Sequence, residues 1–587
     1  MDTSAQLLKN QPWTSYNNKK WALKSFDERL YHHLLQSHDL PDIIARLLAQ
    51  KNIQPDEAPH YLSPKLKDLL PSPASIKNLE QAVDRLYKAF QNKEKITVFG
   101  DYDVDGGTST ALLINFFKAL DYPLDFYIPD RLTEGYGPNP KAFETIRERG
   151  TSLLITVDCG TTAEESLKHA QTLGLDVIVI DHHTCEKAPS LPNTLIINPN
   201  QPNDTSGLTY LCAVGVTFMV LVGFVQRLKK ENFTPIPDLR HFLDLVALGT
   251  VCDMVPLIKL NRAFVRQGLE VFRHAPNFGL KILSQLAQIT GPLEAYHLGF
   301  VLGPRINAGG RLQDSTLGVR LLTTNSLETA QTIGAQLCQL NRDRQTLENA
   351  VFTQAVQQVL EAKSENDPLI CVHSDGWHPG VIGITASRLK EHFDKPTCVI
   401  SFDEKGHGKG SGRSVKGLHL GNLMLDAHKK GFLLNGGGHK MAAGFSLNQE
   451  QLPAFRKFLK EHAFVNEEET VLNVHSLLAP TGITLETIEK MDQLAPFGCE
   501  NPKPKVLLPF MYVDFIQERG ESHLACTLKS ETGHKVEAMA FRAKGTPLEK
   551  ALKTHKSQPC HMIGTLKIDH WNGRKKIVFL IDDCLLT

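Results

Sequence analysis

The sequence predicts an α/β protein built on a doubly wound parallel sheet, with a smaller α/β unit and a β-barrel after it. Three apolar runs rich in β-branched residues, 96–99, 153–157 and 177–180, are typical of parallel strands buried on both faces. From about residue 505 the pattern changes to short strands. The 587 residues are enough for several domains, because single cores stop growing at about 250 to 300 residues.

Between the first strands the sequence has the periodicity of helices. Residues 108–120 repeat apolar side chains at helical spacing, and Thr162 with Glu165 forms a capping box that predicts a helix to about Leu173. Residues 208–225 are almost uncharged and nearly long enough to span a membrane. Because they lie between elements of the first sheet, we predict a helix buried under that sheet and no membrane span.

A long helical stretch leads to the second, smaller α/β unit. Residues 326–362 mix polar and apolar positions at helical spacing, and predict a connector between two lobes that face each other across a cleft. The second unit has predicted strands at 369–372 and 397–402, with a loop at 377–383 that leads into a helix between them. His378 in this loop could touch a substrate or pack against the loop.

The barrel has five predicted strands, at 505–517, 522–530, 535–542, 558–569 and 575–585. A helix at 547–555 between the third and fourth strands gives the order of an OB-fold barrel, and Asn572–Gly573 marks a hairpin turn. OB folds bind single strands by aromatic stacking and a cationic groove. The residues that could supply this surface are Lys567, His570, Trp571, Arg574 and Lys575, although charge on an exposed hairpin can serve solubility alone.

These changes in pattern give the predicted domains. They are an N-terminal segment (1–70), a first α/β domain (71–290), a helical connector (291–362), a second α/β domain (363–465) and the barrel domain (466–587).

Carboxylates are concentrated at the ends of the predicted strands. The segment 100–106, Gly-Asp-Tyr-Asp-Val-Asp-Gly, places Asp101, Asp103 and Asp105 after the first strand. Asp158 follows the second strand, and the run Asp181-His182-His183 follows the third. The carboxyl ends of parallel strands meet at one edge of the sheet, so these groups are expected to converge. The apolar stretch 245–252 delivers one further carboxylate, Asp253.

Converging carboxylates and imidazoles suit Mg²⁺ or Mn²⁺, with Mn²⁺ favoured by the histidines. Bridging aspartates would hold two ions about 4 Å apart, the arrangement that activates water for phosphoryl displacement. A solvated acidic turn is the alternative for 100–106, and a structural role is the alternative for His182 and His183. No nucleophilic Ser or Cys is needed for metal-activated water.

These motifs resemble those of the DHH phosphoesterases. The matching runs are Asp-Tyr-Asp-Val-Asp-Gly, Val-Asp-Cys-Gly, Asp-His-His and Cys-Asp-Met-Val-Pro-Leu, followed by 303–312 and by 436–444, the latter typical of the associated DHHA1 domain. The resemblance extends from about residue 70 to the end. Within the family, the chain most resembles the single-strand-specific 5′-to-3′ exonucleases.

The resemblance implies a set of metal ligands and a catalytic pair. The implied ligands are Asp103, Asp105, Asp158, His182 and Asp253, with Asp101 as an additional one. His183 is implied to lie beside the scissile phosphate and to act with Asp158. Some relatives carry a His where this chain has Phe99, so one side of the first metal site is expected to be less complete here.

The resemblance also implies residues that bind the substrate. Arg131, Arg311, Ser411 and Arg413 would form a pocket for a terminal 5′ phosphate, and Arg305 and Asn307 belong to the 303–312 motif. His439, beside three consecutive glycines, would hold a phosphate near the metals. A surface salt bridge is the alternative for any single Arg, and a flexible linker is the alternative for the glycines.

Composition limits how the chain meets its substrate. Lys plus Arg equals Asp plus Glu, 64 each, so no global basic field attracts nucleic acid and binding must be local. Eleven Cys without a Cys-x-x-Cys pair fit reduced thiols in the cytoplasm, and the N-terminus shows no export signal.

We therefore expect a cytoplasmic exonuclease of DNA repair and recombination that releases 5′ mononucleotides from single-stranded DNA. The alternatives are a phosphodiesterase for short oligonucleotides or cyclic dinucleotides, and a nonhydrolytic nucleic-acid-binding protein. Cleavage of RNA stays open, because no residue evidently senses a 2′-hydroxyl. We expect a monomer, with a helicase and a single-strand-binding protein as open partners.

Overall fold

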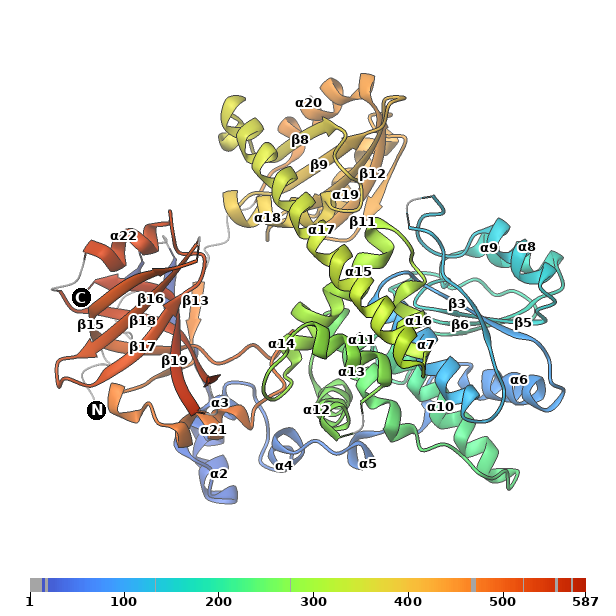
Figure 1. Cartoon of the computed structure of the whole chain (residues 1–587), viewed down its shortest axis with the longest axis horizontal. Coiled ribbons are helices and arrows are strands. Elements are labelled where there is room, and N and C mark those ends of the chain that lie inside the picture. The colour runs from blue at the N-terminus through green and yellow to red at the C-terminus, as the bar shows by residue number, and fades with distance from the viewer. Residues whose placement is uncertain are drawn as a thin grey trace.

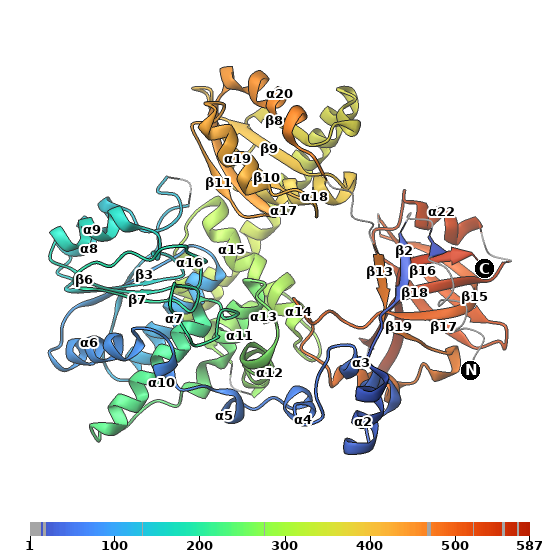
Figure 2. The same ribbon diagram turned by 180° about the vertical axis from the view of Figure 1, so that it is seen from behind.

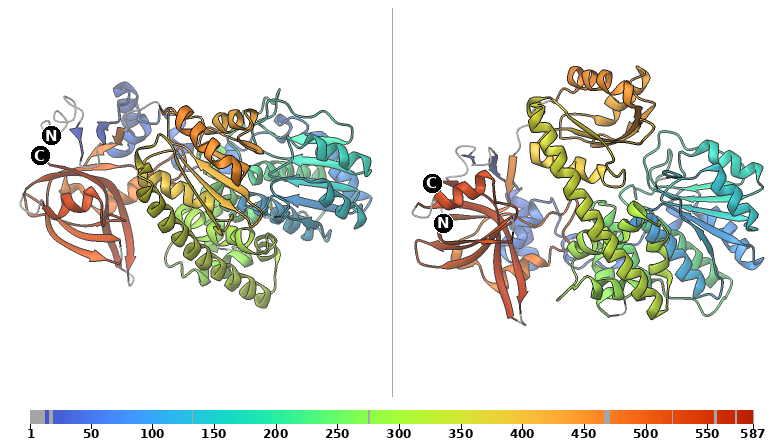
Figure 3. Two further views of the ribbon diagram at one scale, coloured as in Figure 1. Left: turned by 90° about the horizontal axis from the view of Figure 1, so that it is seen from above. Right: turned by 45° about the horizontal axis from the view of Figure 1, so that its top comes forward.

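The protein forms three bodies, a first α/β domain, a second α/β domain and a barrel (Figure 1). The computed structural model describes residues 13–15, 19–131, 133–274, 276–465, 471–520, 522–554, 558–571 and 574–586. Seen from above, the barrel and the first domain lie at opposite ends and the second domain lies between them (Figure 3).

The first domain contains a five-stranded parallel sheet of order β4-β3-β5-β6-β7. The strands are β3 (Ile96–Gly100), β4 (Asp125–Tyr127), β5 (Leu153–Val157), β6 (Asp176–Ile180) and β7 (Thr194–Ile197). Successive side chains of β3 and β5 point to opposite faces, and both faces are buried, as a doubly wound sheet requires. The predicted fold class is confirmed.

Helices cover both faces of this sheet. The helices α6 (Leu79–Gln91), α7 (Val104–Lys118) and α10 (Ala213–Lys230) share a core with Ile96 and Val98 of β3 on one face. The helices α8 (Pro140–Glu148) and α9 (Glu164–Thr172) pack with Phe99 on the other. The helix α7 begins earlier than the pattern at 108–120 predicts, because Asp103 caps it.

The predicted capping box at the start of α9 is wrong. Ala163 occupies the N-cap position and makes no side-chain capping bond. Thr162 instead lies in a turn that the Ala163 N–H closes by donating to the carbonyl of Gly160. Glu164 and Glu165 still place acidic side chains in the first turn, where the helix dipole favours them.

The uncharged stretch 208–225 enters the buried helix α10, as predicted. Its residues Ala213–Leu221 are all buried, most of them in the core beneath the sheet. In the part of the chain that the structure describes, no helix is both long and apolar enough to cross a membrane.

A group of helices joins the first domain to the second. They are α11 (Leu243–Cys252), α12 (Lys259–His274), α13 (Phe278–Leu286), α14 (Ala295–His297), the π-helix η3 (Leu298–Leu302), α15 (Gly303–Leu312), α16 (Leu317–Thr323) and α17 (Leu327–Glu361). The predicted connector is one straight element, the 35-residue helix α17, which Ser326 caps. Figure 1 shows α17 running from the first domain into the second.

The second domain has a five-stranded sheet of order β11-β12-β10-β9-β8. Its strands are β8 (Ile370–Asp375), β9 (Thr397–Phe402), β10 (His407–Arg413), β11 (Asn435–Gly438) and β12 (Ala442–Asn448). Its helices are α18 (Ile382–Phe393), α19 (Leu420–Lys429) and α20 (Leu452–His462). Only β8 and β9 are parallel, so this unit is a mixed α/β domain.

The C-terminal barrel closes through the pairing of β15 with β18. Its strands are β15 (Val506–Arg519), β16 (His523–Ser530), β17 (Lys535–Ala540), β18 (Cys560–Trp571) and β19 (Arg574–Leu586), with α22 (Pro547–Thr554) between β17 and β18. This is the predicted OB order. The turn at 572–573 and the side chains of His570, Trp571 and Arg574 lie outside the described residues.

The N-terminal segment packs on the barrel at the other end of the sequence. The strand β2 (Lys20–Leu23) pairs with β1 (Trp13–Thr14) and, in parallel, with β13 (Val471–Val474) just before the barrel. The helices α2 (Glu28–His38) and α3 (Asp42–Ala49) share the barrel core, together with α21 (Leu485–Asp492). Short helices α4 (Ala58–Leu62) and α5 (Leu66–Leu69) then lead back to the first domain (Figure 2).

Candidate metal centre

The ends of three neighbouring strands place three aspartates at one edge of the first sheet. The backbone N–H of Asp101 donates to Val157, that of Asp158 donates to Ile180, and that of Asp181 donates to Ile197. The sheet ladder therefore continues one residue beyond each strand. Asp158 has a positive φ of 62°, a left-handed conformation that is uncommon for Asp and often marks a functional site.

The start of α7 positions the other two acids of the first cluster. Asp103 is the N-cap, and its Oδ1 accepts from the N–H groups of Asp105 and Gly106 at 2.9 and 3.2 Å. Asp105 lies in the first turn, where its two carboxylate oxygens accept from the N–H groups of Ala213 and Val214 at the start of α10. Two helix N-termini thus fix these carboxylates.

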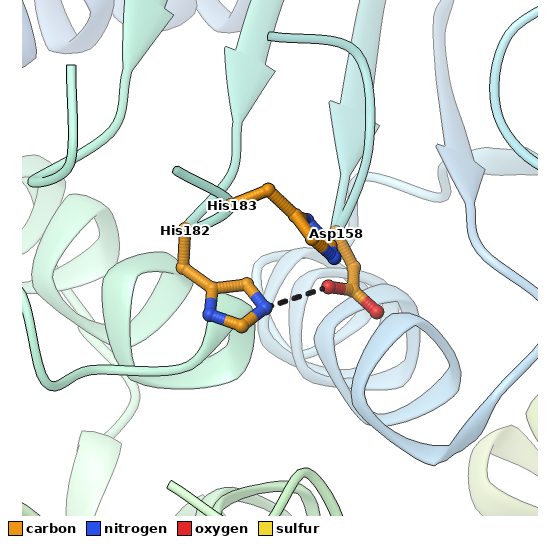
Figure 4. A group of neighbouring side chains, drawn as sticks. All are labelled: Asp158, His182 and His183. Atoms are coloured by element: carbon orange, nitrogen blue, oxygen red, sulfur yellow. Dashed lines mark ion pairs between the residues drawn. The ribbon is translucent and has the colours of Figure 1, made fainter. Parts of the chain in front are cut away.

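The structure brings the six predicted metal ligands and His183 into three overlapping groups. Within each group the ligand atoms lie within 4.8 Å of one another, and the groups are Asp101, Asp103 and Asp158; Asp105, His182 and Asp253; and Asp158, His182 and His183. His182 is central, because its Nε2 lies 3.3 Å from Asp158 Oδ1 (Figure 4). The same nitrogen lies 3.6 Å from Asp253 Oδ2. Asp253 lies at the end of α11, so the apolar stretch 245–252 that precedes it is helical.

Burial and mutual repulsion raise the pKa values of these carboxyls. Burial first, and then the Asp103 charge, raise the pKa of Asp105 to about 7. Burial and the charges of Asp105 and Asp103 raise the pKa of Asp253 to about 9, and the pKa of Asp158 also lies well above its usual value. Bound cations would offset both the burial of these carboxylates and their mutual repulsion.

The unpartnered atoms of the site fit divalent cations. Asp101 Oδ1, Asp158 Oδ1, Asp253 Oδ2 and His182 Nε2 are buried without a hydrogen-bond partner. Burial and the neighbouring His183 lower the pKa of His182 to about 4, so this imidazole is neutral and free to donate its lone pair. Carboxylates with one neutral imidazole are a donor set suited to Mn²⁺ and Mg²⁺.

Asp181 holds the histidine pair and was not among the predicted site residues. Its carboxylate accepts from His183 Nδ1 at 2.8 Å and from the backbone N–H groups of His182, His183 and Thr161. Burial alone would raise the pKa of Asp181, but these bonds leave it lowered, so the group stays ionised. Its place directly before two histidines at a strand end was the available signal.

Tyr136 also lies in the site and was assigned no role from sequence. Its hydroxyl donates to the backbone carbonyl of Asp158 at 3.2 Å and lies 3.3 Å from His183 Nε2. The side chain is 56% exposed, so it borders the open side of the centre. No local sequence pattern marks this contact, which depends on a loop folding back over the strand ends.

Phe99 packs in the core on one face of the first sheet. It is fully buried on the far face of β3, where it stacks on Tyr127 at 5.6 Å and meets the edge of Phe143 at 5.9 Å. The aromatic ring therefore serves the core of the sheet.

Three predicted substrate-binding arginines form a second cluster, which we call the arginine cluster: Arg131, Arg311 and Arg413. Arg311 donates to the carbonyl of Gly380 at 3.0 Å, and Arg413 donates to Ser411 Oγ at 3.2 Å. Burial, and then the charge of Arg131, lower the pKa values of both. Among the described residues no carboxylate lies within ion-pair distance of the three arginines, and such a cluster suits an anion.

The other predicted substrate-binding residues are Arg305, Asn307 and His439, and their described hydrogen bonds are with other parts of the chain. Arg305 donates to the carbonyl of Val301, and Asn307 Oδ1 is buried without a partner. His439 is exposed in the turn after Gly438, whose φ of 146° and close approach to the Ala442 carbonyl require glycine. Within the described ranges no hydrogen bond or ion pair joins Arg305, Asn307 or His439 to the metal-ligand groups.

Models of three domain families match the chain. They are the DHH family, N-terminal domain, at residues 95–250, the DHHA1 domain at residues 366–463 and the RecJ OB domain at residues 474–583. The three matches follow the first domain, the second domain and the barrel in order.

Whole proteins are also similar to the chain. It is 35% identical to the single-stranded-DNA-specific exonuclease RecJ of Bacillus subtilis over 578 residues, which cover 97% of this chain and 71% of that protein. It is 35% identical to RecJ of Escherichia coli, with 83% and 86% of the two chains covered. The structure of Thermus thermophilus RecJ in complex with Mn²⁺ matches with a TM-score of 0.79 at 29% identity, over 97% and 79% of the chains.

Proposed function

The chain belongs to the RecJ family of single-stranded-DNA-specific exonucleases, and from this premise we propose that it degrades single-stranded DNA from the 5′ end and releases 5′ mononucleotides. The observation that carries the proposal is the set of seven converging acids and histidines, four of whose buried atoms lack partners. Such a site fits the metal-dependent hydrolysis of a phosphodiester.

In this proposal each residue of the centre has a role in holding ions or substrate. Asp101, Asp103, Asp105, Asp158, His182 and Asp253 hold two ions, Mn²⁺ or Mg²⁺. Bound ions of this kind lower the pKa of water and neutralise charge on the phosphate. The Nδ1–H of His183 is held by Asp181, which leaves Nε2 to face a phosphate oxygen beside Asp158. Tyr136 orients this imidazole from the open side.

The arginine cluster supports the proposed direction of attack. A terminal 5′ phosphate carries more negative charge than an internal phosphodiester, and guanidinium groups bind phosphates through paired hydrogen bonds. We propose that Arg131, Arg311 and Arg413, with Ser411, bind this terminal group. We further propose that Arg305, Asn307 and His439 contact the strand when it is bound.

The closed barrel favours long strands over dinucleotides. OB folds bind about 4–16 nucleotides of single strand, far more than a dinucleotide offers. The alternative of a dinucleotide phosphodiesterase gives this domain no task. A nonhydrolytic binding protein would have no need of six converging metal-ligand side chains.

The test is digestion of single strands labelled at the 5′ or 3′ end, with duplexes and dinucleotides beside them, in Mn²⁺ or Mg²⁺. We expect early release of the 5′ label as a mononucleotide from single strands alone. The variant Asp158→Ala should lose activity, whereas Glu165→Gln, an exposed acid of α9, should keep it. Early release of the 3′ label, or cleavage confined to dinucleotides, would overturn the proposal.

We also propose that the chain acts in the cytoplasm as a monomer. Its single-stranded substrate must be produced by strand separation, so a helicase and a single-strand-binding protein are the candidate partners. Size-exclusion chromatography with light scattering tests the monomer, and a mass of twice 65.3 kDa would contradict it.

A further inference from the structure

Two aromatic side chains form an exposed stack on the connecting helices. The rings of Tyr296 and Phe300 lie 5.2 Å apart at an angle of 22°. Tyr296 is 55% exposed and Phe300 is 71% exposed, so this pair keeps much of its apolar surface in water. Single exposed apolar residues are ordinary, but a preformed pair of stacked rings offers a flat platform. We call this pair the aromatic step.

The aromatic step is fixed next to the metal centre. It spans α14 and the π-helix η3, and η3 packs on the last turn of α11. A Cβ added at Gly303 would lie 2.4 Å from Cys252 Sγ, and the Cys252 thiol donates to the carbonyl of Leu298. The next residue, Asp253, belongs to the metal-ligand groups. Met254 follows Asp253 with a positive φ and is 73% exposed.

The helix α14, which carries Tyr296, also lies toward the barrel (Figure 1). The helix α14 lies on the barrel side of the connecting helices in both opposed views (Figures 1 and 2). His297, between the two rings in sequence, has its pKa lowered by burial and also by the charge of Lys567 on β18. Lys567 of the barrel therefore lies close enough to His297 of α14 to influence its charge.

We propose that Tyr296 and Phe300 stack against unpaired bases of the DNA strand as it passes from the barrel to the metal centre. The inference rests on the proposed function and adds residues that position its substrate. A single strand combines flat apolar bases with a negative backbone, which matches stacked rings beside Lys567. The packing of η3 on the helix that ends at Asp253, and the place of α14 on the barrel side, favour this occupant over a protein partner.

Binding of single strands by the full-length protein tests the proposal. Fluorescence anisotropy in EDTA, which prevents hydrolysis, would compare the wild type with Tyr296→Ala and Phe300→Ala on a strand of about 30 nucleotides, long enough to reach an OB fold. Each variant should bind about 5- to 150-fold more weakly, the effect of losing about 1–3 kcal/mol of stacking. The variant Phe300→Trp should bind like the wild type, because it keeps an aromatic face.

Two controls separate base stacking from other effects. Phe464→Ala removes a 75% exposed aromatic ring in the second domain and should leave binding unchanged. On an abasic strand of equal length, Tyr296→Ala and Phe300→Ala should bind like the wild type. Equal binding of the base-containing strand by wild type and both alanine variants would overturn the aromatic step, and would instead leave a protein-docking surface. Failure of the wild type to digest any single strand would overturn the proposed function itself.

Discussion

The metal centre and the arginine cluster both gather like charges, but they are held together in different ways. The candidate ligands of the metal centre come from strand ends of the first domain and from the adjoining ends of α7 and α11. The arginine cluster draws Arg131 from the first domain, Arg311 from α15 and Arg413 from the second domain. The metal centre therefore depends on the edge of one sheet and the helices beside it, whereas the arginine cluster depends on how the lobes meet.

This difference assigns chemistry and selection to different parts of the molecule. Ligands fixed by a sheet edge keep their spacing when the lobes move, so hydrolysis depends on local geometry. A cluster shared between lobes is complete only when the lobes meet, so under the proposed function we expect recognition of the strand end to depend on how the lobes are joined. Damage to the metal centre should therefore affect all substrates, and damage to the arginine cluster should depend on the 5′ end.

The largest expected effect is at the metal centre, with Asp158→Asn. Asp158 belongs to two of the three ligand groups, and Asn tolerates its left-handed backbone. Activity on every substrate should fall by at least about 10²–10³-fold, as when a group that stabilises the transition state is lost. Steady-state digestion of 5′-phosphorylated and 5′-hydroxyl strands measures this.

The melting temperature of the metal-free variant separates chemistry from folding. Because the Asp158 carboxyl is buried among like charges, its neutral replacement should leave the melting temperature unchanged or raise it. Activity equal to that of Glu165→Gln, or loss confined to one kind of 5′ end, would break the comparison.

The next effect is at the arginine cluster, with Arg413→Gln. A charge-assisted hydrogen bond contributes about 1.5–3 kcal/mol, so kcat/KM for a 5′-phosphorylated strand should fall about 10- to 150-fold. The loss on a 5′-hydroxyl strand should be smaller, because that end lacks the charged group. Arg240→Gln, at a 75% exposed side chain, is the matched control. Equal losses on both ends would show that Arg413 does not read the terminal phosphate.

A smaller loss is expected from Asp181→Asn, which leaves every ligand in place. The amide can no longer accept all the bonds that hold His183 and Thr161. Losses of about 10- to 100-fold are typical when an outer residue that orients metal ligands is changed. The Mn²⁺ concentration for half-maximal activity should rise, and saturating Mn²⁺ should recover only part of the rate. An unchanged Mn²⁺ dependence would place Asp181 outside the centre.

The sequence predicted the metal centre better than the arrangement of domains, for a physical reason. Strand ends in a parallel sheet meet at one edge, so the positions of Asp101, Asp158 and His182 follow from short-range pattern alone. The contact of Trp21 Nε1 with Asp583 joins residues 562 apart, and no local pattern marks it. The place of the N-terminal segment on the barrel was accordingly not foreseen.

Local rules also failed where tertiary contacts compete. Thr162 and Glu165 have the spacing of a capping box. The backbone conformation there is instead set by the turn that ends at Ala163 and by the hydrogen bond from the Thr161 N–H to Asp181. Tyr136 reaches the centre through a loop whose path the sequence does not define. The fold class and the meeting of the acidic side chains at the strand ends were predictable from the sequence, whereas the contact of Tyr136 was not.

The stability of the metal-free protein should fall as pH rises, because of the metal centre. The folded-state pKa values of Asp105 and Asp253, about 7 and about 9, lie above the usual unfolded value near 3.9. Between these values the two carboxyls hold more protons in the folded state than in the unfolded state, so their contribution to the free energy of unfolding decreases from about pH 4 to about pH 9.

Thermal unfolding at several pH values, with EDTA or with Mn²⁺, measures this dependence. In EDTA the melting temperature should drop between pH 7 and pH 9, above the usual pKa of histidine, since each unit of pKa shift corresponds to about 1.4 kcal/mol. With Mn²⁺ the increment over EDTA should grow with pH, because protons compete for the ligands. A melting temperature in EDTA that rises over this range would contradict the raised pKa values.

The smallest effect we expect is at a third junction, where Arg262 of α12 joins the first domain to the barrel side. Arg262 is 1% exposed, and its guanidinium donates to the carbonyls of Tyr61 and Ala495 at 2.8 Å each. It also lies over the Tyr61 ring at 4.1 Å. Tyr61 belongs to the segment that leads from the barrel to the first domain, and Ala495 lies in the loop between α21 and β15, so one cation holds this segment and a loop of the barrel domain.

Arg262→Met should therefore loosen the barrel without touching the metal centre. Each buried carbonyl left without a donor costs about 1–3 kcal/mol, which lowers the melting temperature and exposes the chain near Ala495 to protease. Arg266→Met is the matched control, because Arg266 donates to Ala495 at a longer 3.4 Å and is less buried. Its loss should be smaller. If the two variants lost equal stability, or if neither gained cleavage near Ala495, contacts other than those of Arg262 would hold the barrel. The junction would then tolerate the loss of a buried charged side chain, whereas we expect the metal centre to lose its activity when one ligand is replaced.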